Sequence, residues 1–222
     1  MTTAMDRAGR PHSPAGERRL AGRPLGVAAL LVLTVGCQEP SRLATRQDGS
    51  SGAAEVTVPG LPNFGKVCDG LYRGGQPTAA GYEALRSRGI RTIVSLRTFD
   101  GGSEDLQEAG FRTYHISFKT AHPETEDVLE FLSIATIPDN RPLFVHCRRG
   151  ADRTGMMVAV YRMVVEDWPR PEAIREMRGM GFSVWNVAIE RYLRNLDVAA
   201  LKRELAGRAA DDRLISHQRT PS

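Results

Sequence analysis

Apolar residues occur in short runs separated by polar turns, and this alternation predicts strands covered by helices. Residues 91–96 and 142–146 are rich in Ile, Val, Leu and Phe, as buried strands are, and glycines follow several of the expected helices. Such alternation is typical of an α/β fold with a central, mainly parallel sheet flanked by helices. We expect strands at 71–73, 91–96, 111–116 and 142–146, and helices at 77–87, 103–109, 124–135, 154–166, 170–177 and 187–204.

The two ends of the chain lack this pattern. Residues 25–33 form an apolar run that follows several arginines, which is typical of a signal segment and short for a membrane span. The next residues, Thr-Val-Gly-Cys, resemble a bacterial lipobox ending at Cys37. We expect a signal segment with a lipobox at 1–37, a flexible tether at 38–59, one domain at 60–206 and a disordered tail at 207–222.

The N-terminal segment determines the expected location. With a lipid on Cys37, the protein would be exported and anchored to a bacterial membrane, facing outside the cytoplasm. Thr34 stands where a lipobox usually has leucine. Cleavage at another position, with export but no lipid, therefore stays open.

The basic character of the chain does not indicate a nucleic-acid partner. The sequence pI is about 9.2 and the formal net charge is +4. Residues 1–36 contain five arginines and two acidic residues, which accounts for +3 of that charge. Because the remainder is nearly neutral, no basic surface for nucleic acid is expected.

The run His-Cys-Arg-Arg-Gly-Ala-Asp-Arg-Thr-Gly at 146–155 carries the chemistry. It lies between an expected strand and an expected helix, an arrangement that aims several backbone N–H groups at one anion. We interpret it as a phosphate-binding loop. Its expected phosphate-binding residues are Arg148, Arg149, Gly150, Ala151, Asp152, Arg153 and Thr154.

Three side chains of this loop have distinct expected roles. Cys147 is the candidate nucleophile, because a thiolate attacks phosphorus and the positive field of the loop favours the ionised sulfur. Arg153 presents a planar fork that can hold two phosphoryl oxygens at once, which the point charge of a lysine cannot do. Thr154 places a hydroxyl where it could hydrogen-bond the departing thiolate.

These residues resemble the signature H-C-x-x-G-x-x-R-[ST]-G of the cysteine-dependent protein tyrosine and dual-specificity phosphatases. The resemblance extends from about Asn63 to about Leu196, through NFGKVCDGLYRGGQP, GIRTIVSLR, AHPETEDVLEFL and YRMVVEDWPRPEAIREM. The chain is similar to compact bacterial dual-specificity phosphatases and to plant and fungal members that cleave inositol pyrophosphates. The resemblance implies the protein tyrosine phosphatase fold, hydrolysis of phosphate monoesters without metal or cofactor, and a supporting role for His146.

Two other classes of protein carry cysteine loops of this kind. Low-molecular-weight phosphatases and related arsenate reductases have the loop near the N-terminus of the domain, whereas Cys147 follows several strands and helices. Rhodanese-like domains also end a strand in a cysteine loop. The Arg-Thr-Gly continuation into an apolar helix favours the phosphatase.

The sequence offers two positions for the general acid, one before the loop and one within it. Protonation of the leaving oxygen needs a carboxylic acid within hydrogen-bond reach, and related enzymes often carry it on a loop well before the nucleophile. Residues 118–123 contain no aspartate, and the acids that follow are Glu124, Glu126 and Asp127. Acidic residues in a first helical turn also have a purely structural explanation. Asp152 lies in the loop itself, and we expect it to be the acid.

We expect a monomeric enzyme that acts on phosphorylated proteins with dual specificity. Arg148 and Arg149 widen the positive field and leave inositol polyphosphate or pyrophosphate as the alternative substrate. A domain that binds phosphorylated ligands without turnover is the second alternative. Retention of Cys147, Arg153 and Thr154 together favours the enzyme.

Overall fold

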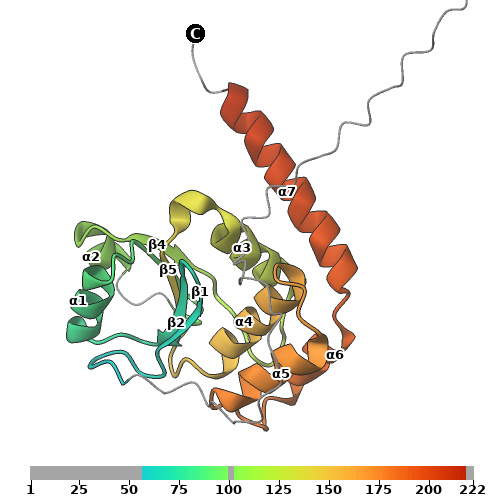
Figure 1. The fold of residues 1–222 in the computed structure, drawn as a ribbon, viewed down its shortest axis with the longest axis horizontal. Helices are drawn as coiled ribbons and strands as arrows, with labels where there is room; N and C mark the ends of the chain where they lie inside the picture. The colour runs from blue at the N-terminus through green and yellow to red at the C-terminus, as the bar shows by residue number, and fades with distance from the viewer. Residues whose placement is uncertain (1–56, 100–102, 219–222) are drawn as a thin grey trace, which may run out of the picture. The chain divides into compact units, whose positions relative to one another are not determined.

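The computed structural model describes residues 57–99 and 103–218 of the 222-residue chain. A five-stranded sheet in the order β1-β2-β5-β3-β4 lies at the centre, with β1 antiparallel to β2 and all other neighbours parallel (Figure 1). The expected α/β fold with a mainly parallel sheet is confirmed. The strands are β1 (Gly65–Cys68), β2 (Leu71–Gly75), β3 (Thr92–Ser95), β4 (Arg112–His115) and β5 (Leu143–Cys147).

Helices cover the sheet on both faces (Figure 1). Within the described residues, none of them combines the length and the apolar character that a membrane crossing needs. The helices are α1 (Ala79–Ser87), α2 (Ser103–Glu108), α3 (Thr125–Thr136), the short 3-10 helix η1 (Pro138–Asn140), α4 (Asp152–Val164), α5 (Arg170–Gly179), α6 (Val187–Asn195) and α7 (Val198–Gln218).

The sheet separates two apolar cores. Side chains alternate between the faces of a strand with a period of two, so Leu143 and Val145 of β5 pack with α3 and α4 in the larger core. Phe144 points the other way, into a smaller core with residues of α1 and Phe111. Cys147 has the same parity as Val145 and belongs to the larger core. The period of β5 therefore places the sulfur on the α4 side of the sheet.

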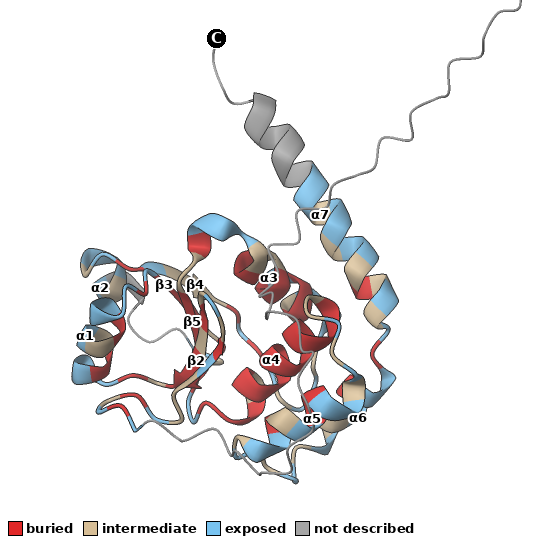
Figure 2. Cartoon of the chain, in the orientation of Figure 1, coloured by how far each residue is buried: buried red, intermediate tan, exposed pale blue. Residues whose placement is uncertain are grey.

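The α4 helix is buried around almost its whole circumference, as the red ribbon at the centre of Figure 2 shows. Gly155 permits a close approach to α5, since a Cβ added there would lie 2.8 Å from Cγ of Met177. A helix enclosed in this way has few freedoms of movement. Its N-terminus is therefore a rigid support for the loop that precedes it.

Several expected boundaries differ from the structure. The helix expected at 187–204 is two helices, because the carboxylate of Asp197 accepts a hydrogen bond from the Ala200 amide at 2.9 Å and caps a new helix. That second helix, α7, continues to Gln218 and so extends into the segment from 207 where a disordered tail was expected. Val58 is 6% exposed and pairs with Leu61, so the folded domain begins earlier than residue 60.

Two further points concern the N-terminal half. Strand β1 was not expected from the sequence, because its short stretch Gly-Lys-Val-Cys has only one buried residue, Val67. Antiparallel pairing with β2 supplies the hydrogen bonds that make it a strand. The signal segment, the lipobox with Cys37 and most of the tether lie outside the described residues.

Candidate active site

The loop between β5 and α4 has the tight geometry of an anion cradle. Strand β5 ends at Cys147 and helix α4 begins at Asp152, so few residues make the connection. Gly150 has a φ of 75°, and a Cβ there would lie 2.4 Å from backbone atoms of Gly74 and Gly75. No side chain fits at that position. The glycine of the signature therefore lets the loop lie directly against β2.

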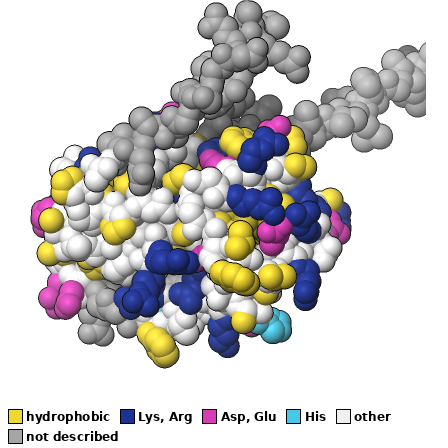
Figure 3. All heavy atoms as spheres, turned by 90° about the horizontal axis from the view of Figure 1, so that it is seen from below, with side chains coloured by type: hydrophobic (Ala, Val, Ile, Leu, Met, Phe, Trp, Pro, Cys, Tyr) yellow, Lys and Arg dark blue, Asp and Glu magenta, His cyan; other side chains and the backbone are white. Residues whose placement is uncertain are grey.

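A cleft of about 300 Å³ opens over this loop. Figure 3 views the molecule from below, toward the carboxyl ends of the parallel strands, and shows Lys and Arg side chains gathered on that face. Such a field favours anionic ligands. The residues that line the cleft are Thr120, Cys147, Arg148, Arg149, Asp152, Arg153 and Asn186.

Arg153 is held from the β3 side of the cleft. Its Nη2 donates to the hydroxyl of Thr98 at 3.2 Å, which leaves other guanidinium donors for a ligand. Among the described residues, its buried Nε has no hydrogen-bond partner. A planar fork with free donors in a cleft beside a cysteine is suited to bind the equatorial oxygens of a phosphoryl group.

Asp152 lines the cleft, and both of its carboxylate oxygens are engaged. Oδ1 accepts a hydrogen bond from the Ser183 amide at 2.8 Å, and Oδ2 forms an ion pair with Arg149. Burial opposes ionisation of Asp152, but the hydrogen bonds from Ser183 and Arg149 outweigh it, so its pKa lies below the usual range. Asp152 is thus a carboxylate before any ligand binds.

The alternative acids on the preceding helix do not line this cleft. Glu126 is exposed and accepts two hydrogen bonds from Arg208 of α7, at 2.9 and 2.7 Å. Glu124 is the exposed N-cap residue of α3. Burial, and next the charge of Glu124, raise the pKa of Asp127. Asp127 is therefore the acid in this group whose environment favours the protonated form.

His146 and Thr154, for which a supporting role is expected, lie buried on either side of the loop in the chain. His146 is 2% exposed, and its ring stacks on Phe144, on the opposite face of the sheet from Cys147. Burial lowers the pKa of His146 to about 4, so the ring is neutral at physiological pH. The Thr154 hydroxyl donates to the Gly74 carbonyl at 3.5 Å. The Thr154 hydroxyl thus joins the first turn of α4 to β2.

The burial of His146 predicts a specific loss of stability in acid. Its pKa is about 4 in the folded state against an ordinary 6.5, so its contribution is fully present above pH 6.5 and is lost as the pH falls toward 4. The free energy of unfolding should decrease by up to about 1.4 kcal/mol per pH unit from this group, or about 3 kcal/mol by pH 4. Urea unfolding of the wild type and of His146→Gln across this range measures the effect. Parallel pH dependences in the two proteins would contradict it.

Three further residues support the loop and were missed from the sequence. Arg73 of β2 donates through Nη2 to the Gly150 carbonyl at 2.6 Å, and the side-chain amide of Asn63 donates to the same oxygen at 3.0 Å. Gln76 donates its backbone amide to the Arg148 carbonyl at 3.2 Å. An arginine inside a short, otherwise buried strand was the available signal for Arg73.

Comparison with known proteins agrees with this geometry. A family profile described as "DSP-PTPase phosphatase fused to NAD+ Kinase" matches residues 69–191. The dual specificity protein phosphatase TpbA of Pseudomonas aeruginosa (strain UCBPP-PA14) is 28% identical over 170 residues, covering 69% of this chain and 76% of TpbA. The inositol diphosphatase DSP5 of Arabidopsis thaliana is 28% identical over 156 residues, covering 67% of this chain and 76% of DSP5.

Solved structures share the fold. The crystal structure of a TpbA variant in complex with phosphotyrosine is 27% identical, with a TM-score of 0.60, and the match covers 65% of this chain and 90% of that one. The catalytic domain of the PP-IP phosphatase SIW14 from S. cerevisiae is 22% identical, with a TM-score of 0.62, covering 69% and 96%. The fold expected from the resemblance is confirmed.

Proposed function

Because the chain belongs to the dual-specificity family of cysteine-dependent phosphatases, we propose that it hydrolyses phosphate monoesters on proteins through a phosphocysteine intermediate. The observation that carries the proposal is the shared cleft of Cys147, Arg153 and Asp152. A nucleophile, a planar cation and a carboxyl group meet there at the N-terminus of a buried helix. These are the parts that phosphoryl transfer to a thiolate needs.

In the proposed reaction the Cys147 thiolate attacks phosphorus, and the bond from phosphorus to the leaving oxygen breaks. Arg153 and the loop amides bind the three equatorial oxygens, whose charge they stabilise in the transition state. A carboxylic acid protonates the leaving oxygen. Water then attacks the phosphocysteine, which releases inorganic phosphate and restores the thiolate.

Phosphotyrosine and other phosphorylated side chains are the proposed substrates. The resemblance to TpbA, whose structure has been determined with phosphotyrosine, supports this assignment. Inositol polyphosphate or pyrophosphate is the second candidate, supported by the similarity to an inositol diphosphatase and by the exposed Arg148 and Arg149 at the cleft. Either substrate places a phosphoryl dianion in the same cradle.

A substrate panel tests the proposal. We expect the purified protein to hydrolyse p-nitrophenyl phosphate in the presence of EDTA, and to prefer phosphotyrosine peptides over phosphoserine peptides and inositol phosphates at equal concentration. A kcat/KM that is higher for inositol pyrophosphates would select the second candidate. Tight binding of phosphorylated ligands with no turnover of any ester would leave a binding domain and contradict the proposed activity.

We propose Asp152 as the general acid, because it lines the cleft and the three acids around α3 do not. A bound phosphoryl dianion adds negative charge beside Asp152 and so favours its protonated form. Asp152→Asn should lower turnover of alkyl and aryl phosphates by roughly 10² to 10⁴, and less for leaving groups acidic enough to depart unprotonated. A series of phenyl phosphates of graded acidity measures this.

The same series separates other roles. A loss in Asp152→Asn that is equal for all leaving groups would mean that Asp152 only orients Arg149 and the Ser183 loop. Glu124→Gln, Glu126→Gln and Asp127→Asn are the matched comparisons. A loss graded by leaving group in one of these variants would move the acid to α3.

We further propose that the protein is exported and held at a bacterial membrane through lipid on Cys37. The arginines and the apolar run before the lipobox support this proposal. Mass analysis of membrane-extracted protein should find a diacylglyceryl group on an N-terminal Cys37. Protein that keeps Met1 and stays in the cytoplasm would contradict the proposal.

A further inference from the structure

Arg73 is a buried charge directly beneath the phosphate-binding loop. It lies in β2 opposite Val145 of β5, and its side chain is 3% exposed. The period of two places Arg73 on the same face as Leu71, which is the α4 side of the sheet and the side of Cys147. Burial of a guanidinium costs several kcal/mol unless strong contacts compensate it. The contacts of this arginine therefore need an explanation.

One contact orients a peptide of the loop. Nη2 of Arg73 donates to the Gly150 carbonyl at 2.6 Å, and Asn63 donates to the same oxygen from a second side at 3.0 Å. Neither donor lines the cleft, so the carbonyl is held away from it. In a planar trans peptide the C=O and N–H groups point in opposite directions. The Ala151 N–H therefore points away from the Arg73 and Asn63 donors.

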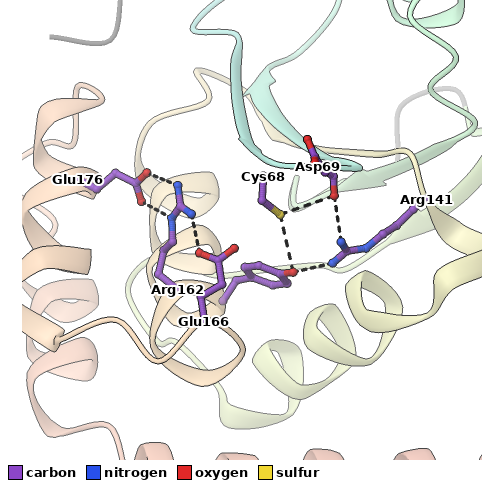
Figure 4. Close-up of polar contacts among 7 residues, drawn as sticks. Cys68, Asp69, Arg141, Arg162, Glu166 and Glu176 are labelled. Atoms are coloured by element: carbon purple, nitrogen blue, oxygen red, sulfur yellow. Dashed lines mark hydrogen bonds and ion pairs between the residues drawn. The ribbon is translucent and has the colours of Figure 1, made fainter. Parts of the chain in front are cut away.

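The charge of Arg73 has no paired carboxylate among the described residues. Its Nε and Nη1 are buried and have no hydrogen-bond partner within residues 57–99 and 103–218. Glu176 of α5 is the acid whose charge acts most strongly on Arg73. It is already paired with Arg162, which donates to its two carboxylate oxygens at 3.0 and 2.7 Å (Figure 4). Burial lowers the pKa of Arg73 to about 10, so it remains charged at neutral pH, and the charges of Glu176 and Cys147 favour that charged form.

Electrostatic coupling is reciprocal. If an ionised Cys147 stabilises the guanidinium of Arg73, the guanidinium stabilises the thiolate by the same free energy. The charged residues that line the cleft with Cys147 come from its own loop: Arg148, Arg149, Asp152 and Arg153. Arg97, which follows β3, acts electrostatically on the adjacent His146. His146, its neighbour in β5, is neutral. Arg73 is distinct because its positive charge comes from another strand and from a site shielded from solvent, where screening is weak.

We propose that Arg73 is a positioning residue of this active site, which holds the Gly150–Ala151 peptide with its amide toward the phosphoryl group and favours the Cys147 thiolate by its buried charge. The inference rests on the proposed function in one respect, the role of Cys147 as nucleophile. Arg73 does not contact the substrate and acts through the loop and the sulfur.

Two substitutions separate the charge from the hydrogen bond. Arg73→Gln removes the charge and keeps an amide donor for the Gly150 carbonyl, whereas Arg73→Lys keeps the charge. We expect Arg73→Gln to slow alkylation of Cys147 by iodoacetamide about 10-fold or more at mildly acidic pH, with the difference vanishing at alkaline pH where both proteins carry the thiolate. Arg73→Lys should restore most of the alkylation rate. Turnover in Arg73→Gln, as kcat/KM for p-nitrophenyl phosphate, should fall by roughly 10².

Arg141→Gln is the matched control. Arg141 also donates to backbone carbonyls, those of Ala135 and Asp69, but it precedes β5 at the end opposite the cradle. Its loss should lower the melting temperature and leave the pH dependence of Cys147 alkylation unchanged. A purely structural role of Arg73 would give the same pattern for both variants.

Several results would overturn the proposal. Wild-type alkylation rates at every pH in a folded Arg73→Gln would exclude the electrostatic role, as would an equal slowing at every pH or a failure of Arg73→Lys to restore the rate. If Arg73→Gln does not fold, Asn63→Ala removes the second donor to Gly150 without changing charge. It should lower kcat/KM and leave alkylation unchanged, and an unchanged kcat/KM would overturn the positioning of the peptide.

Alkylation also keeps the two proposals apart. It requires the thiolate but no turnover. A protein that hydrolyses no phosphate ester and yet shows Arg73-dependent alkylation would contradict the proposed function and leave only the electrostatic effect of Arg73 on Cys147 standing. Normal hydrolysis of phosphate esters with alkylation that does not depend on Arg73 would support the proposed function and contradict the electrostatic role of Arg73.

Discussion

Cys147→Ser should abolish hydrolysis of every phosphate ester, with kcat lowered by about 10⁵ or more, as expected when the nucleophile of a covalent mechanism is lost. A serine hydroxyl has nearly the same size as the thiol but does not ionise near neutral pH. The cradle of loop amides and Arg153 is unchanged in this variant. We therefore expect Cys147→Ser to bind phosphotyrosine peptides with an affinity close to the KM of the wild type.

Initial rates and equilibrium binding measure the two halves of this prediction. Thr136→Ser is the control, because Thr136 ends α3, where its hydroxyl donates to the Leu132 carbonyl at 2.8 Å, away from the cradle. The control should hydrolyse phosphate esters at the rate of the wild type. Residual turnover above one hundredth of the wild-type rate in Cys147→Ser would mean that another group attacks phosphorus.

Arg153→Lys should lower kcat/KM by roughly 10³ to 10⁵, the range found when an arginine that stabilises a phosphoryl transition state is removed. Lysine retains the charge, so the prediction depends on the planar fork and its ability to bind two oxygens at once. Because the fork follows the oxygens into the transition state, kcat should fall more than KM rises. Steady-state kinetics with p-nitrophenyl phosphate separates the two constants.

The control for this substitution is Arg112→Lys. Arg112 is an exposed arginine at the start of β4, where it donates to the Asp139 carbonyl and the Asn140 side chain. It lies at the amino end of a parallel strand, away from the cradle, and its replacement should leave kcat/KM unchanged. An Arg153→Lys variant with the kinetics of this control would show that charge alone suffices and that the fork is not used.

The fold and the loop were predictable because their signals are local. Strands such as 91–96 and 142–146 are short apolar runs, and the period of side chains along β5 places Cys147 on the side of α4. The position of Gly150 before a helix N-terminus also depends on neighbouring residues only. Apolar runs, turns and helix starts are each encoded within a few neighbouring residues, so they could be inferred from the sequence alone.

Contacts between distant segments could not be inferred in this way. Arg73 and Gly150 are separated by 77 positions, and Asn63 and Gly150 by 87, so no spacing rule relates them. The same holds for Glu126, whose partner Arg208 lies on α7, in a stretch expected to be disordered. The general acid could not be assigned from the sequence for the same reason. Which carboxylates are already paired with arginines depends on the tertiary structure.

The predicted helix boundaries were wrong where a capping residue interrupts a continuous apolar pattern. The apolar pattern runs on from α6 into α7, and it predicts one helix over 187–204. The carboxylate of Asp197 instead caps the Ala200 amide and starts a new helix. A residue that can serve either as an exposed helix position or as an N-cap is decided by packing, here of α7 against α3 and α4.

The most direct test of the proposed mechanism is to trap its intermediate. Wild-type protein mixed rapidly with p-nitrophenyl phosphate and quenched in acid should carry one added phosphoryl group, located by peptide mass spectrometry on Cys147 and absent from Cys147→Ser. Asp152→Asn should change how much intermediate accumulates, since it slows formation of the phosphocysteine. Turnover of the ester at the wild-type rate with no phosphoryl group on Cys147 at any time, or with the group on another residue, would contradict the phosphocysteine mechanism.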